Sequence, residues 1–343
     1  MKTIKLGTTG IEIIQNGFGC LPIQRITDEE AVYLLRKAYD NGIKFFDTAR
    51  AYSDSEHKVG LAFEGIDRSS YYLATKTQSR DVEGFWKDLN ESLKNLKTDY
   101  IDIYQFHSVE QCYKPNDGTG MYEAMLEAKE KGLIKHIGIT THRCKVAEEI
   151  IESGLYETLQ YPLSYIADKI DIELVEKCKN ANMGFIGMKG LSGGLLNNSK
   201  VCMAFVSQFD NVIPIWGIQK ESELDEWLSY IDNTPVYDDE AKKVVEEDTK
   251  ILGKDFCRGC GYCSPCSVDI KIFNCARMSQ MIRRSPSANW LTPEWQAEMK
   301  KIEDCIDCGA CMSRCPYNLN TPELLRKNYE DYKKILAGEI KVM

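Results

Sequence analysis

Residues 71–107 read YYLATKTQSRDVEGFWKDLNESLKNLKTDYIDIYQFH, and they indicate the fold class more clearly than any other part of the sequence. Its two ends, YYLATK (71–76) and YIDIYQFH (100–107), contain the β-branched and aromatic residues that strands favour. Between them, VEGFWKDLNESLKNL (82–96) has apolar residues at spacings of three and four, the period of an amphipathic helix. Because two parallel strands need a crossover connection, usually a helix, the stretch predicts two neighbouring parallel strands joined by a helix.

The same alternation extends in both directions. Six further strand candidates flank the unit: NGFGC (16–20), IKFFDT (43–48), IKHIGIT (134–140), ETLQYP (157–162), MGFIGM (183–188) and VIPIWGI (212–218). Helical patterns lie between them, at 28–42, 120–132, 145–154 and 172–182. The alternation predicts a parallel sheet with helical crossovers, either a closed barrel or an open, doubly wound sheet. We favour a (β/α)8 TIM barrel, because eight units fit between residues 15 and 231 and no GxGxxG motif follows an early strand.

The two ends of the chain do not belong to this alternation. The opening TIKLGTTGIEII (3–14) predicts a hairpin that turns at Gly7–Gly10 and plugs one end of the barrel. A polar helical segment (233–255) leads out of the barrel, and the residues after it show helical patterns without strands. We therefore predict a barrel domain at 1–235 and a mostly α-helical domain at 236–343.

Composition limits the class of partner. The net charge of -9 argues against nucleic acid as a main partner, because phosphate backbones select basic surfaces. The sequence has no run of about 18 apolar residues, as a membrane span would need. Its start, MKTIKLGTTG, lacks the apolar core of a signal peptide. We therefore expect a soluble, cytoplasmic protein that binds neither nucleic acid nor a membrane.

Four polar side chains follow three consecutive strands of the predicted barrel. Asp47 comes after IKFF, Tyr52 lies in the loop behind it, Lys76 ends YYLATK, and His107 ends YIDIYQFH. The C-terminal ends of barrel strands carry the chemistry, so we expect these side chains to converge. A neighbouring ammonium favours an ionised phenol, so Lys76 would lower the pKa of Tyr52, the proton donor to a carbonyl oxygen. Asp47 would charge-balance Lys76, and His107 would orient the carbonyl.

The same residues resemble the aldo-keto reductase family. FFDTARAYSDSE (45–56) contains the family's Asp and Tyr, LATK (73–76) its Lys, and YQFH (104–107) its His, and the resemblance runs from about residue 1 to 231. It implies a (β/α)8 barrel and NADP-type nicotinamide binding. It also implies hydride transfer to or from a small-molecule carbonyl or alcohol, with Tyr52 as general acid or base.

The resemblance further implies residues that contact the cofactor. Gln160 falls where the family contacts the nicotinamide carboxamide, and Met188 where many members stack an aromatic residue on the ring. Gly193 and Gly194 lie in the loop that borders the pyrophosphate. The segment after the eighth strand lacks the Arg and the terminal Asn that usually hold the 2′-phosphate and the adenine, so Lys220 is left as the phosphate partner. We expect NADP(H), with NAD(H) as the alternative.

Other histidines and scattered cysteines are expected to have no catalytic role. His57, His136 and His142 are expected to be structural or on the surface, although His142 directly follows the fifth strand on the same barrel face. Of the chain's 14 cysteines, nine fall between Cys257 and Cys315. The other five are expected to be small buried hydrophobes: Cys20, Cys112, Cys144, Cys178 and Cys202.

Two motifs account for the clustered cysteines, which the reducing cytosol would keep out of disulfides. One is Cys-x2-Cys-x2-Cys-x2-Cys, from Cys257 to Cys266, and the other is Cys-x2-Cys-x2-Cys-x3-Cys, from Cys305 to Cys315, followed by Pro316. The second has the spacing of bacterial two-cluster ferredoxins, in which the fourth Cys ligates the other cluster. We therefore predict two [4Fe–4S] clusters. Their ligand sets are Cys257, Cys260, Cys263 and Cys315 for the first cluster, and Cys305, Cys308, Cys311 and Cys266 for the second.

Structural zinc is the competing interpretation, because CxxC pairs also bind zinc. Zinc takes four tetrahedral ligands, whereas two CxxCxxC runs supply too many thiolates locally, so iron–sulfur clusters are favoured. Cys275 lies in a helical pattern and is expected to pack, although it could replace Cys266 as a ligand. The helical surroundings resemble an α-helical ferredoxin domain, and aldo-keto reductases with such a C-terminal extension form a recognisable subfamily.

Three functions are open from the sequence. The first is an enzyme that couples carbonyl–alcohol interconversion in the barrel to one-electron transfer by the clusters and a ferredoxin-like redox partner. A hydride carries two electrons and a cluster one, so a direct relay needs a converter such as a flavin, which stays open as a cofactor although no clear flavin motif is present. The second function is ordinary nicotinamide chemistry with structural or redox-sensing clusters. The third is an electron-transfer protein with an inactive barrel, which the presence of all four polar residues argues against.

Overall fold

The computed structural model describes residues 1–252, 256–284 and 287–342, and these form two compact units. The first unit comprises Met1–Gly190 and Ser199–Tyr237. The second comprises Leu191–Asn198 and Asp238–Met343. The short segment Leu191–Asn198 therefore groups with the C-terminal unit, although in the sequence it lies between two parts of the first unit.

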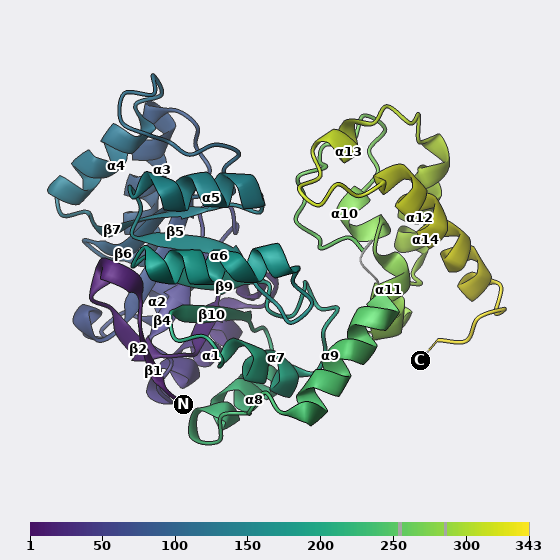
Figure 1. The fold of residues 1–343 in the computed structure, drawn as a ribbon, viewed down its shortest axis with the longest axis horizontal. Helices are drawn as coiled ribbons and strands as arrows, with labels where there is room; N and C mark the ends of the chain where they lie inside the picture. The colour runs from purple at the N-terminus through teal and green to yellow at the C-terminus, as the bar shows by residue number, and fades with distance from the viewer. Residues whose placement is uncertain (253–255, 285–286, 343) are drawn as a thin grey trace. The chain divides into compact units, whose positions relative to one another are not determined.

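The first unit is built around a closed barrel of eight parallel strands, so the predicted (β/α)8 fold is confirmed and the open sheet is excluded (Figure 1). Each strand pairs with the next along the chain, and the last strand pairs with the first to close the barrel. The strands are β3 (Gly17–Gly19), β4 (Phe45–Asp47), β5 (Tyr72–Thr77), β6 (Ile101–Phe106), β7 (Ile134–Thr140), β8 (Thr158–Pro162), β9 (Gly184–Met188) and β10 (Val212–Gly217).

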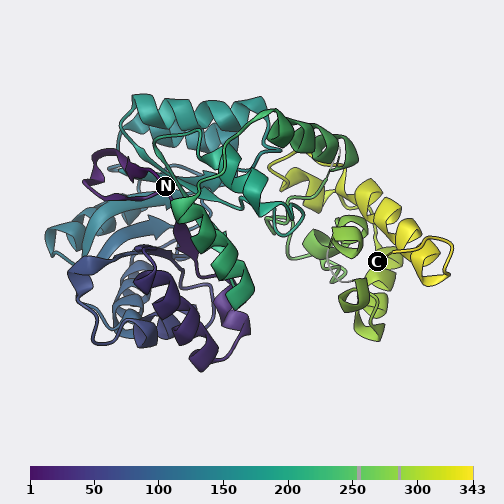
Figure 2. The same cartoon turned by 90° about the horizontal axis from the view of Figure 1, so that it is seen from below.

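Helices surround the strands, as Figure 2 shows from below. The helices of this unit are α1 (Asp28–Asp40), α2 (Ser55–Ala62), α3 (Val82–Leu96), α4 (Met121–Glu130), α5 (Cys144–Ser153), α6 (Lys169–Asn180), α7 (Ser199–Val206) and α8 (Glu221–Asp232). Local sequence sets where they begin. Before α1, the Thr27 hydroxyl accepts a hydrogen bond from Glu30 N at 3.2 Å while the Glu30 carboxylate accepts one from Thr27 N at 2.9 Å, which forms a capping box. Before α3, Asp81 accepts from Gly84 N at 2.8 Å.

The N-terminal hairpin of β1 (Thr3–Lys5) and β2 (Glu12–Ile14) covers the end of the barrel where the strands begin. Its apolar side chains share one buried cluster with residues of β4, β5, β6, β9 and β10. The fit is close: a Cβ at Gly7, whose φ is +55°, would lie 2.3 Å from the backbone N of Gly184. The hairpin closes this end, as the sequence predicts.

Buried polar side chains gather toward the C-terminal ends of the strands. Asp47, Lys76, Gln105, Thr140 and Gln160 are each at most 1% exposed. Strand register places Lys76 beside Gln105 and Thr140 beside Gln160. These side chains form a polar layer above the apolar core of the barrel. Buried polar groups are costly unless they form hydrogen bonds or ion pairs, so we expect the members of this layer to pair with one another.

The second unit is mostly helical and has an apolar core of its own, as predicted. Its core includes Ile272, Met278, Met299, Leu325 and Tyr332. Helix α14 packs against α10, α11 and α13. The helices of this unit are α9 (Asp239–Leu252), α10 (Ile272–Cys275), α11 (Met278–Arg284), α12 (Pro293–Lys300), α13 (Ala310–Ser313) and α14 (Thr321–Leu336).

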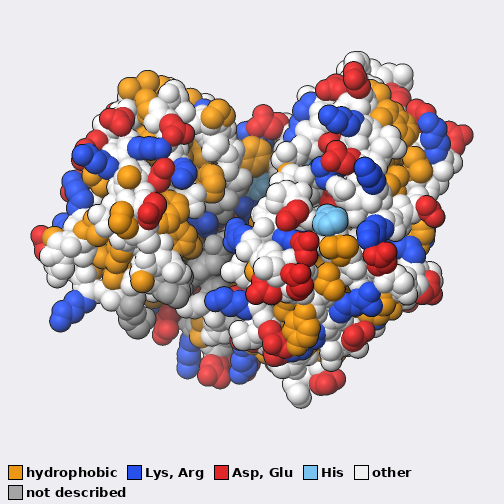
Figure 3. All heavy atoms as spheres, turned by 180° about the vertical axis from the view of Figure 1, so that it is seen from behind, with side chains coloured by type: hydrophobic (Ala, Val, Ile, Leu, Met, Phe, Trp, Pro, Cys, Tyr) orange, Lys and Arg blue, Asp and Glu red, His pale blue; other side chains and the backbone are white. Residues whose placement is uncertain are grey.

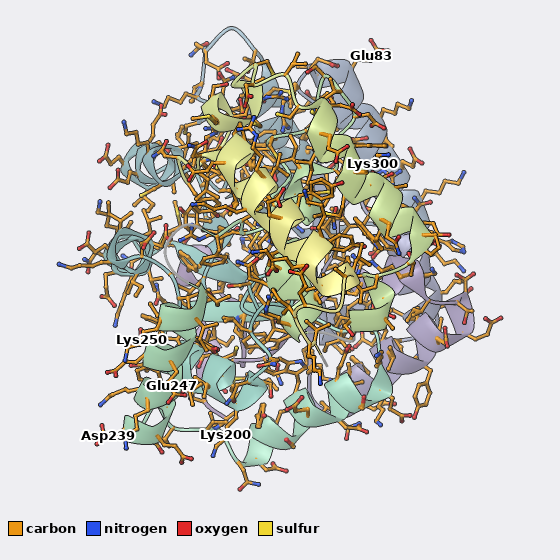
Figure 4. All side chains as sticks on the ribbon, turned by 90° about the vertical axis from the view of Figure 1, so that its right-hand side faces the viewer. Glu83, Lys200, Asp239, Glu247, Lys250 and Lys300 are labelled. Carbon is orange, nitrogen blue, oxygen red and sulfur yellow. The ribbon has the colours of Figure 1, made fainter. Side chains whose placement is uncertain are left out.

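Acidic and basic side chains are scattered and interspersed on the face that Figure 3 shows. Helix α9 exposes Asp239, Glu247 and Lys250 along its length (Figure 4). Among the described residues, no helix combines the length and the hydropathy that crossing a membrane requires.

Candidate active site and cysteine pockets

The four predicted polar residues meet at the C-terminal end of the barrel. Asp47 is the last residue of β4, Lys76 lies near the end of β5, and His107 directly follows β6. Tyr52 lies in the loop between β4 and α2 and is partly exposed. The ammonium of Lys76 is 5.2 Å from the centroid of the Tyr52 ring, and the rings of Tyr52 and His107 are 5.8 Å apart, edge to face at 82°. The phenol therefore contacts both an ammonium and an imidazole.

A buried ion pair fixes the ammonium. Lys76 Nζ lies 2.6 Å from Asp47 Oδ1, and the two side chains are 1% and 2% exposed. The same ammonium donates to the carbonyl oxygen of Thr48 at 2.6 Å. The amide nitrogens of Gln105 and Gln160 donate to the Asp47 carboxylate at 3.3 and 3.4 Å. Burial lowers the pKa of Lys76, but the charge and hydrogen bond of Asp47, together with Tyr52 and Cys20, outweigh burial and raise that pKa above its usual value, so Lys76 stays charged.

The pKa of Tyr52 differs from the sequence expectation. Burial raises the pKa of the Tyr52 phenol, and the Lys76 ammonium, through its charge and a hydrogen bond, opposes this effect without reversing it. Lys76 thus lowers the pKa of Tyr52, as the sequence predicts, but the cost of desolvating a phenolate is the larger effect, so the net shift is upward and not toward neutrality. Tyr52 is protonated at neutral pH, which suits a proton donor.

His107 is neutral. Burial, together with the positive charges of Lys76, Arg80 and Lys189, lowers its pKa to about 3. Its Nδ1 is buried and, in the part of the chain that the structure describes, has no hydrogen-bond partner. The Arg80 guanidinium donates to the backbone carbonyl of His107 at 2.8 Å. An uncharged imidazole has one N–H donor and one acceptor, so His107 can orient a carbonyl oxygen.

The eight predicted cluster ligands surround two pockets in the second unit. The first pocket is lined by Cys257, Cys260, Cys263 and Cys315. The second is lined by Cys266, Cys305, Cys308 and Cys311, and Cys263 also borders it. Each pocket thus takes three cysteines from one motif and the fourth from the other.

Cys275 borders neither pocket. It is fully buried in the core of the unit, where its Sγ faces the carbonyl oxygen of Glu298 at 4.0 Å. Four of the five scattered cysteines are buried, and Cys144 is partly exposed.

Sequence comparison identifies the two units. Residues 4–211 match the aldo/keto reductase family. The chain belongs to this family. Residues 256–320 match a 4Fe–4S dicluster domain, so the chain has the predicted C-terminal extension of iron–sulfur type.

Named relatives match the barrel part of this aldo/keto reductase. L-galactose dehydrogenase from Arabidopsis thaliana is 30% identical over 210 residues, 56% of this chain and 66% of that protein. Methylglyoxal reductase DkgB from Escherichia coli O157:H7 is 35% identical over 137 residues, 37% of this chain and 48% of that protein. The chain therefore spans less than two thirds of either relative. An aldo-keto reductase from Bacillus halodurans, in its holo form, shares the fold with a TM-score of 0.63 at 21% identity, covering 72% of this chain and 96% of that one.

The predicted cofactor residues belong to both units: Gln160, Met188 and Lys220 to the first, and Gly193 and Gly194 to the second. Gln160 lies beside Asp47, and Met188 ends β9 and packs against the barrel core. Gly193 and Gly194 lie in the segment that groups with the second unit. Lys220 is exposed immediately before α8.

Two residues at the C-terminal end of the barrel were not assigned a functional role from the sequence. Gln105 donates to the Asp47 carboxylate, a role that a single amide in the strand YIDIYQFH does not signal. His142, expected to be structural, is 5% exposed, and burial, then Lys189 and His107, lower its pKa well below the usual value. His136 pairs with Glu157 at 2.7 Å, and His57 is exposed, so both lie outside the site.

The neutrality of His107 predicts its behaviour in solution. In protein labelled with ¹³C in the imidazole rings, the His107 signal, identified by its absence in His107→Gln, should not move between pH 8 and pH 5. The reason is a pKa of about 3, far below that of a free imidazole, roughly 6.5. A titration midpoint between pH 5 and pH 7 for that signal would contradict the assignment.

Proposed function

We propose that the barrel interconverts a small carbonyl compound and its alcohol, with Tyr52 exchanging the proton at the substrate oxygen. One observation carries the proposal: a partly exposed phenol contacts the ammonium of a buried ion pair on one side and a neutral imidazole on the other. This arrangement supplies a proton, stabilises the charge left behind and orients the acceptor.

Nicotinamide, when bound, supplies or accepts the hydride. The raised pKa keeps Tyr52 protonated, so its Oη holds the proton that a reduced carbonyl oxygen takes up. The phenolate then left on Tyr52 is stabilised by the Lys76 ammonium, which Asp47 and the Thr48 carbonyl keep in place. His107 is uncharged and contributes a hydrogen bond that orients the carbonyl. In the direction of alcohol oxidation, the phenolate of Tyr52 accepts the proton.

The names of the relatives guide the choice of substrate. One is a reductase of methylglyoxal, a small aldehyde, and another is a dehydrogenase of L-galactose. We take small aldehydes and sugar-like alcohols as the substrate class.

We further propose that the second unit holds two [4Fe–4S] clusters, as a domain covering residues 236–343 beside a barrel domain covering 1–235. The donor set fits: two pockets are each lined by the four thiols that the spacing predicts. Such clusters transfer electrons one at a time. Cys308 of the second set is exposed, which supports exchange with a ferredoxin-like redox partner. The free thiols suit a reducing compartment, so we place the protein in the cytoplasm.

For the nicotinamide, we propose NADP(H) binding with only modest discrimination against NAD(H). Lys220 is the candidate phosphate partner, but acidic groups surround it. The backbone N–H groups of Gln219 and Lys220 donate to the Glu223 carboxylate at 2.9 and 3.1 Å, so a carboxylate already occupies the start of α8. Glu221 adds a further negative charge in the first turn. These charges oppose a 2′-phosphate, and Lys220 offsets them only in part.

The role of Tyr52 is tested by Tyr52→Phe. With a panel of small aldehydes that includes methylglyoxal, reduction should fall by roughly 10²-fold or more, because the proton donor is lost. Nicotinamide affinity should stay near wild type. Wild-type turnover in the variant, or a wild-type protein inactive on the whole panel with both nicotinamides, would contradict the proposal.

The cluster assignment is tested by metal analysis. Anaerobically purified protein should be brown and contain about eight irons per chain, the sum of two four-iron clusters. Cys315→Ala should damage the first cluster and Cys266→Ala the second, although each residue lies in the other cluster's motif. Cys275→Ala is the matched control and should keep all the iron, because Cys275 borders neither pocket. A colourless protein with stoichiometric zinc is the result that excludes the clusters.

The cofactor proposal is tested by titrating NADPH and NADH. A charge-assisted contact contributes about 1.5–3 kcal/mol, so the lack of the usual Arg should weaken NADPH preference by roughly one to two powers of ten relative to the family. Lys220→Ala should remove most of the preference that remains. Lys131→Ala, an exposed lysine after the C-terminal end of α4, should leave it unchanged. Tight NADPH-selective binding that survives Lys220→Ala would show that another residue binds the phosphate.

A further inference from the structure

Arg277 carries a positive charge that the proposed reaction does not use. It lies between α10 and α11 and is partly buried. Its Nη1 donates to the carbonyl oxygen of Gly193 at 3.1 Å, and its Nε is buried without a hydrogen-bond partner among the described residues. A buried cation is costly unless a negative charge lies nearby. The position of Arg277 therefore calls for an anionic neighbour.

The first cysteine pocket provides that neighbour. Burial lowers the pKa of Arg277, and the Coulombic effect of an ionised Cys257 raises it. Ala276, the residue before Arg277, lines the pocket together with Cys257. The backbone N of Gly259 donates to Cys257 Sγ at 3.4 Å, and the other side of Gly259 faces the guanidinium. Gly259 thus lies between the Arg277 guanidinium and the Cys257 sulfur.

Two glycines make room for the guanidinium. A Cβ at Gly193, whose φ is +69°, would lie 2.5 Å from Arg277 Nη1. A Cβ at Gly259, whose φ is +65°, would lie 2.8 Å from Arg277 Cζ. Both distances are shorter than real Cβ contacts allow, so any side chain at either position would displace the guanidinium or the loop. The space between Gly193 and Gly259, called the slot below, therefore holds the planar guanidinium against the cysteine motif that begins at Cys257.

We propose that Arg277 is a positioning residue for the first [4Fe–4S] cluster and raises its reduction potential by holding a positive charge beside the loop of Cys257. The proposal rests on the cluster ligation proposed above. Reduction adds a negative charge to a cluster, and a fixed cation in a poorly polarisable surrounding favours the more negative state. Ala276, the residue before Arg277, lines the first pocket and not the second, and Gly259, which faces the guanidinium, lies between two cysteines of the first pocket, Cys257 and Cys260. The effect therefore falls on the first cluster, and the second serves as an internal reference.

The test is a redox titration of the anaerobic, cluster-loaded full chain, followed by electron paramagnetic resonance, with iron and sulfide measured in the same samples. The two signals are assigned with Cys257→Ser and Cys308→Ser. At the wild-type midpoint of the first cluster, Arg277→Gln should lower its ratio of reduced to oxidised form about tenfold, which is about 59 mV for a one-electron couple. Arg277→Lys keeps the charge and should restore most of the potential. The second cluster should not shift.

A matched glycine pair tests the slot. Gly193→Ala should lower the first potential in the same direction as Arg277→Gln, because the new methyl group displaces the guanidinium. Gly194→Ala places an alanine at φ +89° with nothing within 4 Å of its Cβ, so it strains the neighbouring backbone without touching Arg277. It should leave the potential unchanged.

Three results would overturn the role of Arg277. If the reduction potential of the first cluster is unchanged in Arg277→Gln while both clusters are present, the role of Arg277 is excluded, but the proposed cluster ligation stands. Equal shifts of both clusters, or failure of Arg277→Lys to restore the potential, indicate a general structural effect. A chain that purifies without iron overturns this proposal together with the ligation.

Discussion

The barrel site depends on one ion pair, Lys76 and Asp47, that is almost completely removed from water. Desolvating two ions costs several kcal/mol each, and attraction offsets this only when the remaining donors and acceptors also pair. Here the Thr48 carbonyl takes one ammonium hydrogen, while Gln105 and Gln160 donate to the carboxylate. The Lys76–Asp47 pair and its hydrogen bonds therefore link strands β4, β5, β6 and β8. The Lys76 ammonium in turn contacts the ring of Tyr52.

In the second unit, the corresponding constraint is that four cysteine thiols must line each pocket. Neither cysteine motif alone supplies four thiols to a pocket, because each pocket takes its fourth from the other motif. The chain must bring together cysteines that lie about 40 to 60 positions apart in the sequence before either set of donors is complete. Arg277 lies beside the first cysteine motif, and a partly buried cation is stabilised there when the neighbouring thiols and their cluster carry negative charge.

Much of this architecture follows from periodicity. The eight barrel strands lie near the predicted ranges because they are short β-branched and aromatic runs, and α1, α3, α4, α5 and α6 do so because their apolar residues have a period of 3.6. Helices α2, α7 and α8 were not predicted. Asp47, Lys76 and His107 were found because parallel strands end at the same face of a barrel. The sign of the Tyr52 pKa shift was missed, because burial of the phenol, which no sequence pattern measures, outweighs the charge of Lys76. Gln105 was missed because a single amide in a strand has no local signal.

The order of elements, the polar strand-end residues and the spacing of the cysteines follow from the amino-acid sequence alone, because these are local and periodic properties. The three-dimensional structure was needed to find which amides hold Asp47, that His107 is neutral, and that Leu191–Asn198 groups with the C-terminal unit. Hydrogen-bond partners, desolvation and close glycine contacts depend on distances between residues far apart in the chain, which no local pattern contains. Gly193 and Arg277, 84 positions apart, are one such pair.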